Sequence, residues 1–102
     1  MSERLEQLQK MVEQEPNDPF LPYAIALEHG KAEHFEEAIT WLDRTLEIDR
    51  HYCYAFFQKA KMYSEMGEDD QARKALEDGM ERAAFSGDDK AYREMAELLG
   101  SL

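Results

Sequence analysis

The three histidines of this sequence are the residues whose chemistry would best suit a metal ion. His29 and His34 lie five residues apart in EHGKAEH, whereas a zinc-protease helix carries two histidines four apart with a glutamate beside the first. No glutamate stands three residues before a histidine, as the di-iron helix bundles require. We therefore predict that the histidines are solvent-exposed or turn residues, and that the chain has no metal site.

The stretch HYC brings His51 close to Cys53 and raises the possibility of an imidazole–thiolate pair. Catalysis by such a pair needs a third group that orients the base, and the neighbouring sequence offers none. A free cysteine also behaves as a small apolar residue in a core. We interpret Cys53 as a packing residue.

Two pairs of acids, Glu36–Glu37 and Asp69–Asp70, resemble acid–base couples, but each stands at the expected start of a helix. Negative charge is favourable there because it complements the helix dipole. The five glycines are scattered singly, so no glycine-rich phosphate loop is present. The sequence therefore predicts a protein that is not an enzyme and needs no cofactor.

The chain has 102 residues, enough for one domain, with 23 acidic and 12 basic side chains and a net charge of −11. This excess argues against nucleic acid, whose binding needs a basic surface. The acids are spread evenly, which favours a solvated surface over a docking patch. With one cysteine, no signal-like N-terminus and no apolar run of membrane length, we expect a soluble, cytoplasmic protein without a membrane partner.

Apolar residues recur at helical spacing throughout, and small and large ones repeat 34 residues apart, as in Ala38 with Ala72 and Leu42 with Leu76. Nothing alternates as a strand would. Pro22 must lie in the first turn of its helix, where a missing N–H costs least. The pattern predicts six helices, at about 2–15, 19–31, 35–48, 52–66, 69–86 and 89–100.

Glycine and aspartate supply signals for where these helices end and begin. Gly67 and Gly87 are suited to the left-handed conformation that closes a helix. Asp69 is expected to cap the helix that follows Gly67, and Asp88 or Asp89 the last helix.

The 34-residue copies resemble tetratricopeptide repeats, which are helix–turn–helix units of that length. The second copy carries the pattern at these positions: Phe56, Ala60, Tyr63, Gly67, Ala72, Leu76 and Gly79. The first copy keeps the small and large residues of its second helix but departs at Pro22, where the pattern has tryptophan, and at Thr45, where it has a small residue. Lys59 departs at a leucine position of the second copy.

The resemblance implies an all-α fold: a short right-handed α-solenoid of stacked antiparallel helix pairs, with about six helices. Small residues such as Ala38 and Ala72 would let neighbouring helices approach closely. We expect a single domain over residues 1–102. Its parts would be an N-terminal half-repeat helix (1–17), two repeats (18–51 and 52–87) and a C-terminal capping helix (88–102).

In this family the first helix of each pair lines a concave groove that holds a protein or peptide partner. Carrying those positions over gives the candidate partner-binding residues Phe20, Tyr23, Leu27, Tyr54, Phe57, Gln58, Lys61 and Tyr92. We expect Tyr54 and Phe57 to be exposed as an aromatic floor with Lys61 at its edge; the alternative is that the last helix covers them. Tyr23 and Leu27 stand where some relatives place a lysine and an asparagine that grip a terminal carboxylate, so we do not expect that specialised function.

Two functions remain open. The first is a non-catalytic interaction module that binds a peptide or helix of a partner protein in an aromatic-lined groove. The second is an assembly module that homodimerises, or docks within a larger complex, through open solenoid ends. Apolar residues expected at those ends are Leu5 and Leu8 on one side, and Leu98 and Leu99 on the other.

Overall fold

The computed structural model describes residues 2–102, which form six α-helices joined by short turns. The helices are α1 (Glu3–Gln14), α2 (Phe20–Lys31), α3 (Phe35–Ile48), α4 (Cys53–Glu65), α5 (Asp69–Ser86) and α6 (Asp89–Gly100). Each begins and ends within one residue of its predicted bounds. No strand occurs among these residues, and none of their helices combines the length and apolar character needed to cross a membrane.

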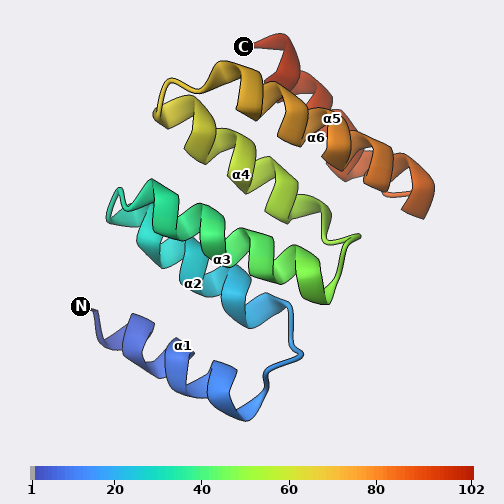
Figure 1. The fold of residues 1–102 in the computed structure, drawn as a ribbon. Coiled ribbons are helices and arrows are strands. Elements are labelled where there is room, and N and C mark those ends of the chain that lie inside the picture. Colours follow the sequence, from blue (N-terminus) through green and yellow to red (C-terminus); the bar gives the residue numbers. More distant parts are fainter. Residues whose placement is uncertain (1) are drawn as a thin grey trace.

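The helices stack in chain order, so that the N-terminus and the C-terminus lie at opposite ends of the molecule (Figure 1). Each helix packs mainly on its neighbours in sequence, and α4 also contacts α6. The molecule measures 37 × 29 × 18 Å along its principal axes. It is an all-α helical repeat solenoid, as predicted.

The recurring apolar stripe forms the core. Ala38, Leu42, Ala72 and Leu76 are all fully buried. Because the solenoid is elongated, its core is divided into three clusters: one between α1 and α2, one shared by α2, α3 and α4, and one shared by α4, α5 and α6. The small alanines lie where helices approach closely, which confirms their predicted packing role.

The helices end as the glycines predict. Gly67 and Gly87 adopt left-handed conformations with φ of 77° and 76°. The turn after α2 has the same conformation at Glu33, where φ is 61°, although no glycine is present. Glycine tolerates this region freely, whereas a side chain with a Cβ is strained there.

One predicted cap is confirmed and one is wrong. The Asp88 carboxylate accepts a hydrogen bond of 3.0 Å from the Ala91 N–H and caps α6. Asp69 does not cap α5, because it is already the first residue of that helix. The N-cap is Glu68, whose side chain makes no capping hydrogen bond.

The departures of the first repeat from the family pattern have a packing explanation. In the second repeat, a Cβ added to Gly79 would lie 2.6 Å from the Phe56 Cβ, so the close approach of α4 and α5 at this point favours a glycine. The equivalent positions of the first repeat hold Pro22 and Thr45, and both are fully buried. The first repeat therefore has a smaller ring and a larger partner residue in place of the aromatic–glycine pair.

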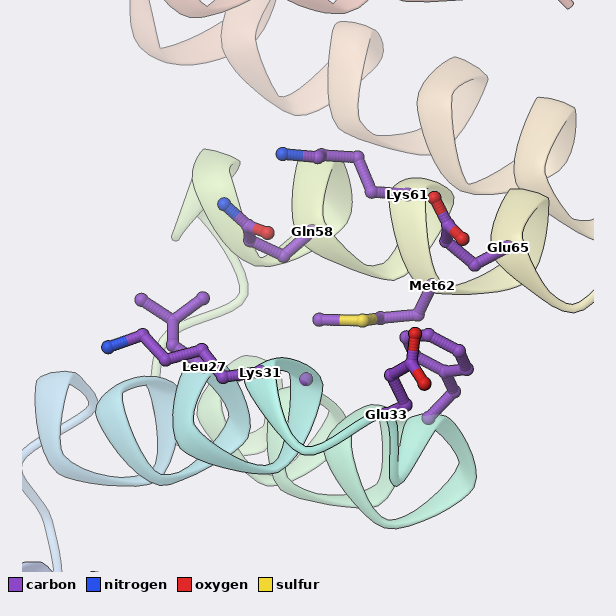
Figure 2. A pocket seen from close by; sticks show the side chains of 9 residues that line it. Leu27, Lys31, Glu33, Gln58, Lys61, Met62 and Glu65 are labelled. Carbon is purple, nitrogen blue, oxygen red and sulfur yellow. The ribbon is translucent and has the colours of Figure 1, made fainter. Parts of the chain in front are cut away.

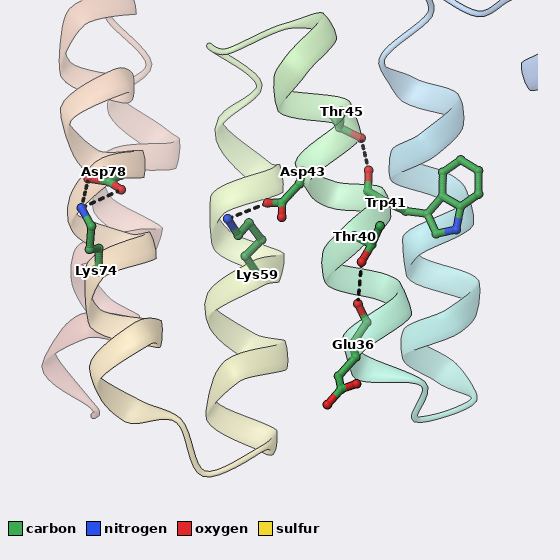
Figure 3. A network of polar contacts seen from close by, with 8 residues as sticks. All are labelled: Glu36, Thr40, Trp41, Asp43, Thr45, Lys59, Lys74 and Asp78. Carbon is green, nitrogen blue, oxygen red and sulfur yellow. Dashed lines mark hydrogen bonds and ion pairs between the residues drawn. The ribbon is translucent and has the colours of Figure 1, made fainter.

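Lys59 occupies a position where the family pattern has leucine, and the structure gives it an ionic partner. Its Nζ lies 2.7 Å from the Asp43 carboxylate of α3, across the boundary between the two repeats (Figure 3). The lysine side chain is largely buried, whereas that of Asp43 is half exposed. Solvent screening limits such a pair to about 0.2–1 kcal/mol, but its geometry links α3 to α4.

The expectation of an open apolar N-terminal end is wrong. Leu5 and Leu8 are buried against α2 in the first core cluster. The exposed side of α1 carries mostly charged and polar residues, including Glu3, Arg4 and Lys10, together with Met11. This amphipathic helix therefore closes the N-terminal end with a polar outer face.

Candidate binding groove

A cleft of about 510 Å³ separates the C-terminal half of α2 from the middle of α4. Leu27 and Lys31 enter it from α2, while Gln58, Lys61 and Met62 enter from α4 (Figure 2). Its remaining wall is made by the end of α2, the α2–α3 turn, the start of α3 and the end of α4, which contribute Gly30, Glu33, Phe35 and Glu65 respectively. The cleft thus has an apolar floor and a charged rim, as peptide-binding sites commonly do.

Glycine shapes the floor of this cleft. A Cβ added to Gly30 would lie 2.5 Å from the methyl carbon of Met62, so the absence of a side chain lets the Met62 thioether lie against α2. Figure 2 shows this thioether extending from α4 towards α2. A flexible, polarisable methionine at this position provides an adaptable apolar surface.

The two lysines of the rim are held in different ways. The Lys61 ammonium lies 5.6 Å from the centre of the Phe57 ring, in a cation–π contact. The Lys31 Nζ lies 3.2 Å from the Glu28 carboxylate. Glu33 and Glu65 complete the rim, so the cleft presents charges of both signs around an apolar centre.

The structure brings together three of the predicted binding residues, Leu27, Gln58 and Lys61, in this cleft. Tyr23 lies beside them: burial raises the pKa of its phenol, and a hydrogen bond with Gln58 opposes that rise. Its ring also packs on Tyr52, with centroids 5.1 Å apart. Tyr23 therefore lies at the edge of the cleft, beside Gln58.

Tyr54 and Phe57 are half-buried rather than exposed, which corrects the expectation of an open aromatic floor. Their rings meet edge-on, 6.3 Å apart, and both pack against the α4–α5–α6 core cluster. Burial raises the pKa of the Tyr54 phenol, and Glu94 of α6 raises it further. The last helix thus covers part of these aromatics, although Phe57 still lines a shallow depression beside α6.

The two remaining predicted residues lie outside the cleft. Phe20 is 52% exposed at the start of α2, where its N–H donates to the Asp18 carboxylate. Tyr92 is 40% exposed and lies beside Met80 and Leu99, in a depression between α5 and α6.

The candidate residues carried over from the family pattern do not include four side chains that line the rest of the cleft, Lys31, Phe35, Met62 and Glu65. Lys31 follows Leu27 by one helical turn, and Glu65 follows Lys61 in the same way, so extending the groove positions by four residues identifies both. Phe35 is the first residue of α3, and Met62 lies on the face of α4 that packs against the core, so no spacing signal distinguishes either from a core residue.

Cys53 is buried in the core, as predicted. Its thiol donates to the His51 carbonyl oxygen at 3.4 Å, and burial raises its pKa. A thiol held protonated is a poor nucleophile. His29 and His34, in contrast, lie close to Glu37, and the donor atoms of the three side chains fall within 4.8 Å of one another.

The stacked helix pairs and the concave cleft define the class of protein: this chain has the fold of a tetratricopeptide repeat domain. No family model and no curated protein sequence matches it. Among solved structures, it is similar to a tetratricopeptide repeat domain protein from Salinibacter ruber, with 27% identity, a TM-score of 0.74, and coverage of 82% of this chain and 93% of the other.

A protein from Bordetella parapertussis matches over 99% of this chain and 88% of its own length, with 26% identity and a TM-score of 0.84. The TPR2B domain of yeast Sti1, solved as a complex with pHsp70, has a TM-score of 0.87 at 22% identity, and the match covers 93% of this chain and 76% of that domain's chain. At this identity the likeness concerns the fold.

Proposed function

We propose that this chain is a non-catalytic protein-interaction module that binds a segment of a partner protein in the cleft between α2 and α4. The observation that carries the proposal is the composition of this cleft: Leu27, Phe35 and Met62 form an apolar floor, and two lysines and two glutamates surround it. An apolar anchor of the partner would occupy the floor, and charged residues on either side of the anchor would pair with the rim.

The fold supports this proposal because the likeness to the TPR2B domain of yeast Sti1, which was solved as a complex with pHsp70, extends over 93% of the chain. Within this proposal, Gln58 and Lys61 contact the partner directly. Phe57 holds the Lys61 side chain in place through a cation–π contact, and Tyr23 lies beside Gln58. Tyr54 supports Phe57 from the α6 side.

The test begins with peptides selected from a random display library against the wild-type protein. Binding of a selected peptide would be measured for Leu27→Glu and Lys61→Glu, and the amide NMR shifts it causes would be mapped. We expect a loss of about five-fold or more, because losing a central contact of an interface costs more than about 1 kcal/mol. Lys74→Glu, on the exposed side of α5, is the charge-matched control and should bind normally.

Peptides that shift only amides outside the cleft would contradict the proposal, as would equal affinity for all three variants. Melting curves must accompany these measurements, since Leu27 is half-buried. Lys61 is exposed, so its variant separates lost binding from lost folding.

A second function, assembly through the C-terminal end of the solenoid, is favoured by one observation. Met80, Tyr92 and Leu99 line a shallow depression of about 390 Å³ between α5 and α6. A further helix or a second copy of the chain would cover this apolar area.

A further inference from the structure

His29, His34 and Glu37 meet at the junction of α2 and α3. They line a cavity of about 600 Å³ whose other walls include Leu5 of α1 and Trp41 of α3. One ligand atom from each of the three side chains lies within 4.8 Å of the other two. His29 is buried, with a side chain 10% exposed, whereas His34 and Glu37 are exposed.

The backbone of the α2–α3 turn brings His29 and His34 together, although a spacing of five residues would not place them side by side on one helix. After α2 the chain makes a turn in which the His34 N–H donates to the His29 carbonyl at 2.9 Å, and the Glu33 N–H donates to the Gly30 carbonyl at 3.0 Å. This 6→1 and 5→2 pairing is a Schellman motif, and it places the side chains of its first and last residues in contact. The two imidazole centroids are 5.9 Å apart.

The start of α3 adds the third ligand. His34 is the N-cap of α3 and Glu37 is the third residue of that helix, two positions whose side chains face each other across the first helical turn. His34 makes no capping hydrogen bond, so its ring is available for another partner. The Glu37 carboxylate also lies 3.8 Å from Nδ1 of His29.

We propose that His29, His34 and Glu37 bind one divalent transition-metal ion of the zinc type. Two imidazole nitrogens and one carboxylate oxygen form a ligand set that Zn²⁺ accepts, with the remaining position left to water or to a side chain of a partner. Bonds of about 2.0–2.1 Å place tetrahedral ligands roughly 3.4 Å apart, so the ligand atoms, which now lie within 4.8 Å of one another, must close by at most about 1.4 Å. The exposed His34 and Glu37 side chains can rotate towards His29, which the core holds in place.

The charged residues around His29, His34 and Glu37 are compatible with a bound cation. Lys31 and Arg4 are the nearby bases, and both are paired with Glu28: the Lys31 Nζ lies 3.2 Å from one carboxylate oxygen and the Arg4 Nε 3.1 Å from the other. Glu28 thus neutralises part of their repulsion, and Glu37 contributes a negative charge directly to the site.

The fold itself does not require this ligand set. The second repeat makes the same turn, in which the Glu68 N–H donates to the Tyr63 carbonyl at 2.8 Å. Positions equivalent to the three ligands there hold Tyr63, Glu68 and Gln71, which lack an imidazole. The site therefore distinguishes the first repeat from the second, and an ion bound there would fasten the end of α2 to the start of α3.

The experiment is a calorimetric titration of the metal-free protein with Zn²⁺, repeated with Co²⁺ to observe the absorption bands of a coordinated ion. We expect one equivalent to bind. Losing an outer-shell partner already costs about 10–100-fold in affinity, so His34→Ala and Glu37→Gln should lose at least this much. His51→Ala and Glu36→Gln are the matched controls and should bind as the wild type does.

Histidine-ring NMR resonances give a second measurement, because the chain has three histidines. Zinc should shift the ring signals of His29 and His34 and leave those of His51 unchanged. Failure of the wild type to bind zinc at millimolar concentration would overturn the proposal. An unchanged zinc affinity of His34→Ala would also overturn it. So would binding of several zinc equivalents with the same loss of affinity in Glu36→Gln and Glu37→Gln, because this would indicate binding to surface carboxylates alone. The two test variants replace exposed residues, so their metal-free melting curves should match the wild type.

Discussion

At the scale of single residues, the turn after α2 shows both the use and the limit of local signals. Gly67 and Gly87 identify left-handed helix ends directly from the sequence. The equivalent turn at Glu33 has no glycine, and the helix end there follows from the change in apolar pattern alone. For the same reason the convergence of His29 and His34 could not be predicted, because spacing rules for metal ligands assume one continuous helix.

Replacing Glu33 by glycine should stabilise the protein. A left-handed conformation costs a residue with a Cβ about 1–2 kcal/mol, and Glu33 adopts it at φ 61°. Glycine removes this strain, but the greater freedom of the unfolded chain costs roughly 0.5–1 kcal/mol of stability. We therefore expect the free energy of unfolding, measured in urea, to rise by about 0.5–1 kcal/mol.

Glu33→Ala provides the control, because it removes the same carboxylate and keeps the Cβ. If alanine stabilises as much as glycine does, charge and not backbone strain is the cause.

At the scale of helices, the 34-residue period predicts the elements and most of the buried stripe, because burial on one face imposes helical periodicity. The angle at which the last helix docks is not encoded in that period. It is set by side-chain shapes between α4, α5 and α6, and this is why Tyr54 and Phe57 were expected to be exposed but are half-buried. The sequence of α1 indicates a polar outer face. The burial of Leu5 and Leu8, however, depends on how α1 packs on α2.

The contact between α4 and α5 should be sensitive to one added methyl group. In Gly79→Ala, the new Cβ would lie 2.6 Å from the Phe56 Cβ and 2.5 Å from the Met95 sulfur, so neighbouring side chains must move. Overpacking costs about 1–3 kcal/mol, and the better helix propensity of alanine returns up to about 1 kcal/mol. We expect a net loss of roughly 1 kcal/mol in chemical unfolding.

Gly100→Ala is the matched control, since nothing lies within 4 Å of its added Cβ. It should leave stability unchanged or slightly raised. A Gly79→Ala protein as stable as this control would show that the helices separate easily at that point.

At the scale of the whole molecule, the two ends of the solenoid differ. The N-terminal end is closed by the polar face of α1, while the C-terminal end exposes Tyr92 and the depression it shares with Met80 and Leu99. The repeat pattern predicts that ends exist, but which end is apolar depends on packing. An apolar contact between copies through the solenoid ends would therefore use the C-terminal end.

We expect the purified chain to be a monomer of 11.9 kDa in light scattering, at low and at high salt. A stable dimer buries about 1,200–2,000 Å² of surface, more than a shallow depression of this size offers, and a net charge of −11 on each copy opposes association at low salt. High salt screens that repulsion and is the stricter condition. A dimer that persists at micromolar concentration would contradict the prediction. Its dissociation by Tyr92→Glu, but not by Phe20→Glu or Phe85→Glu at the other exposed aromatics, would place the interface at the C-terminal end and support the assembly function instead.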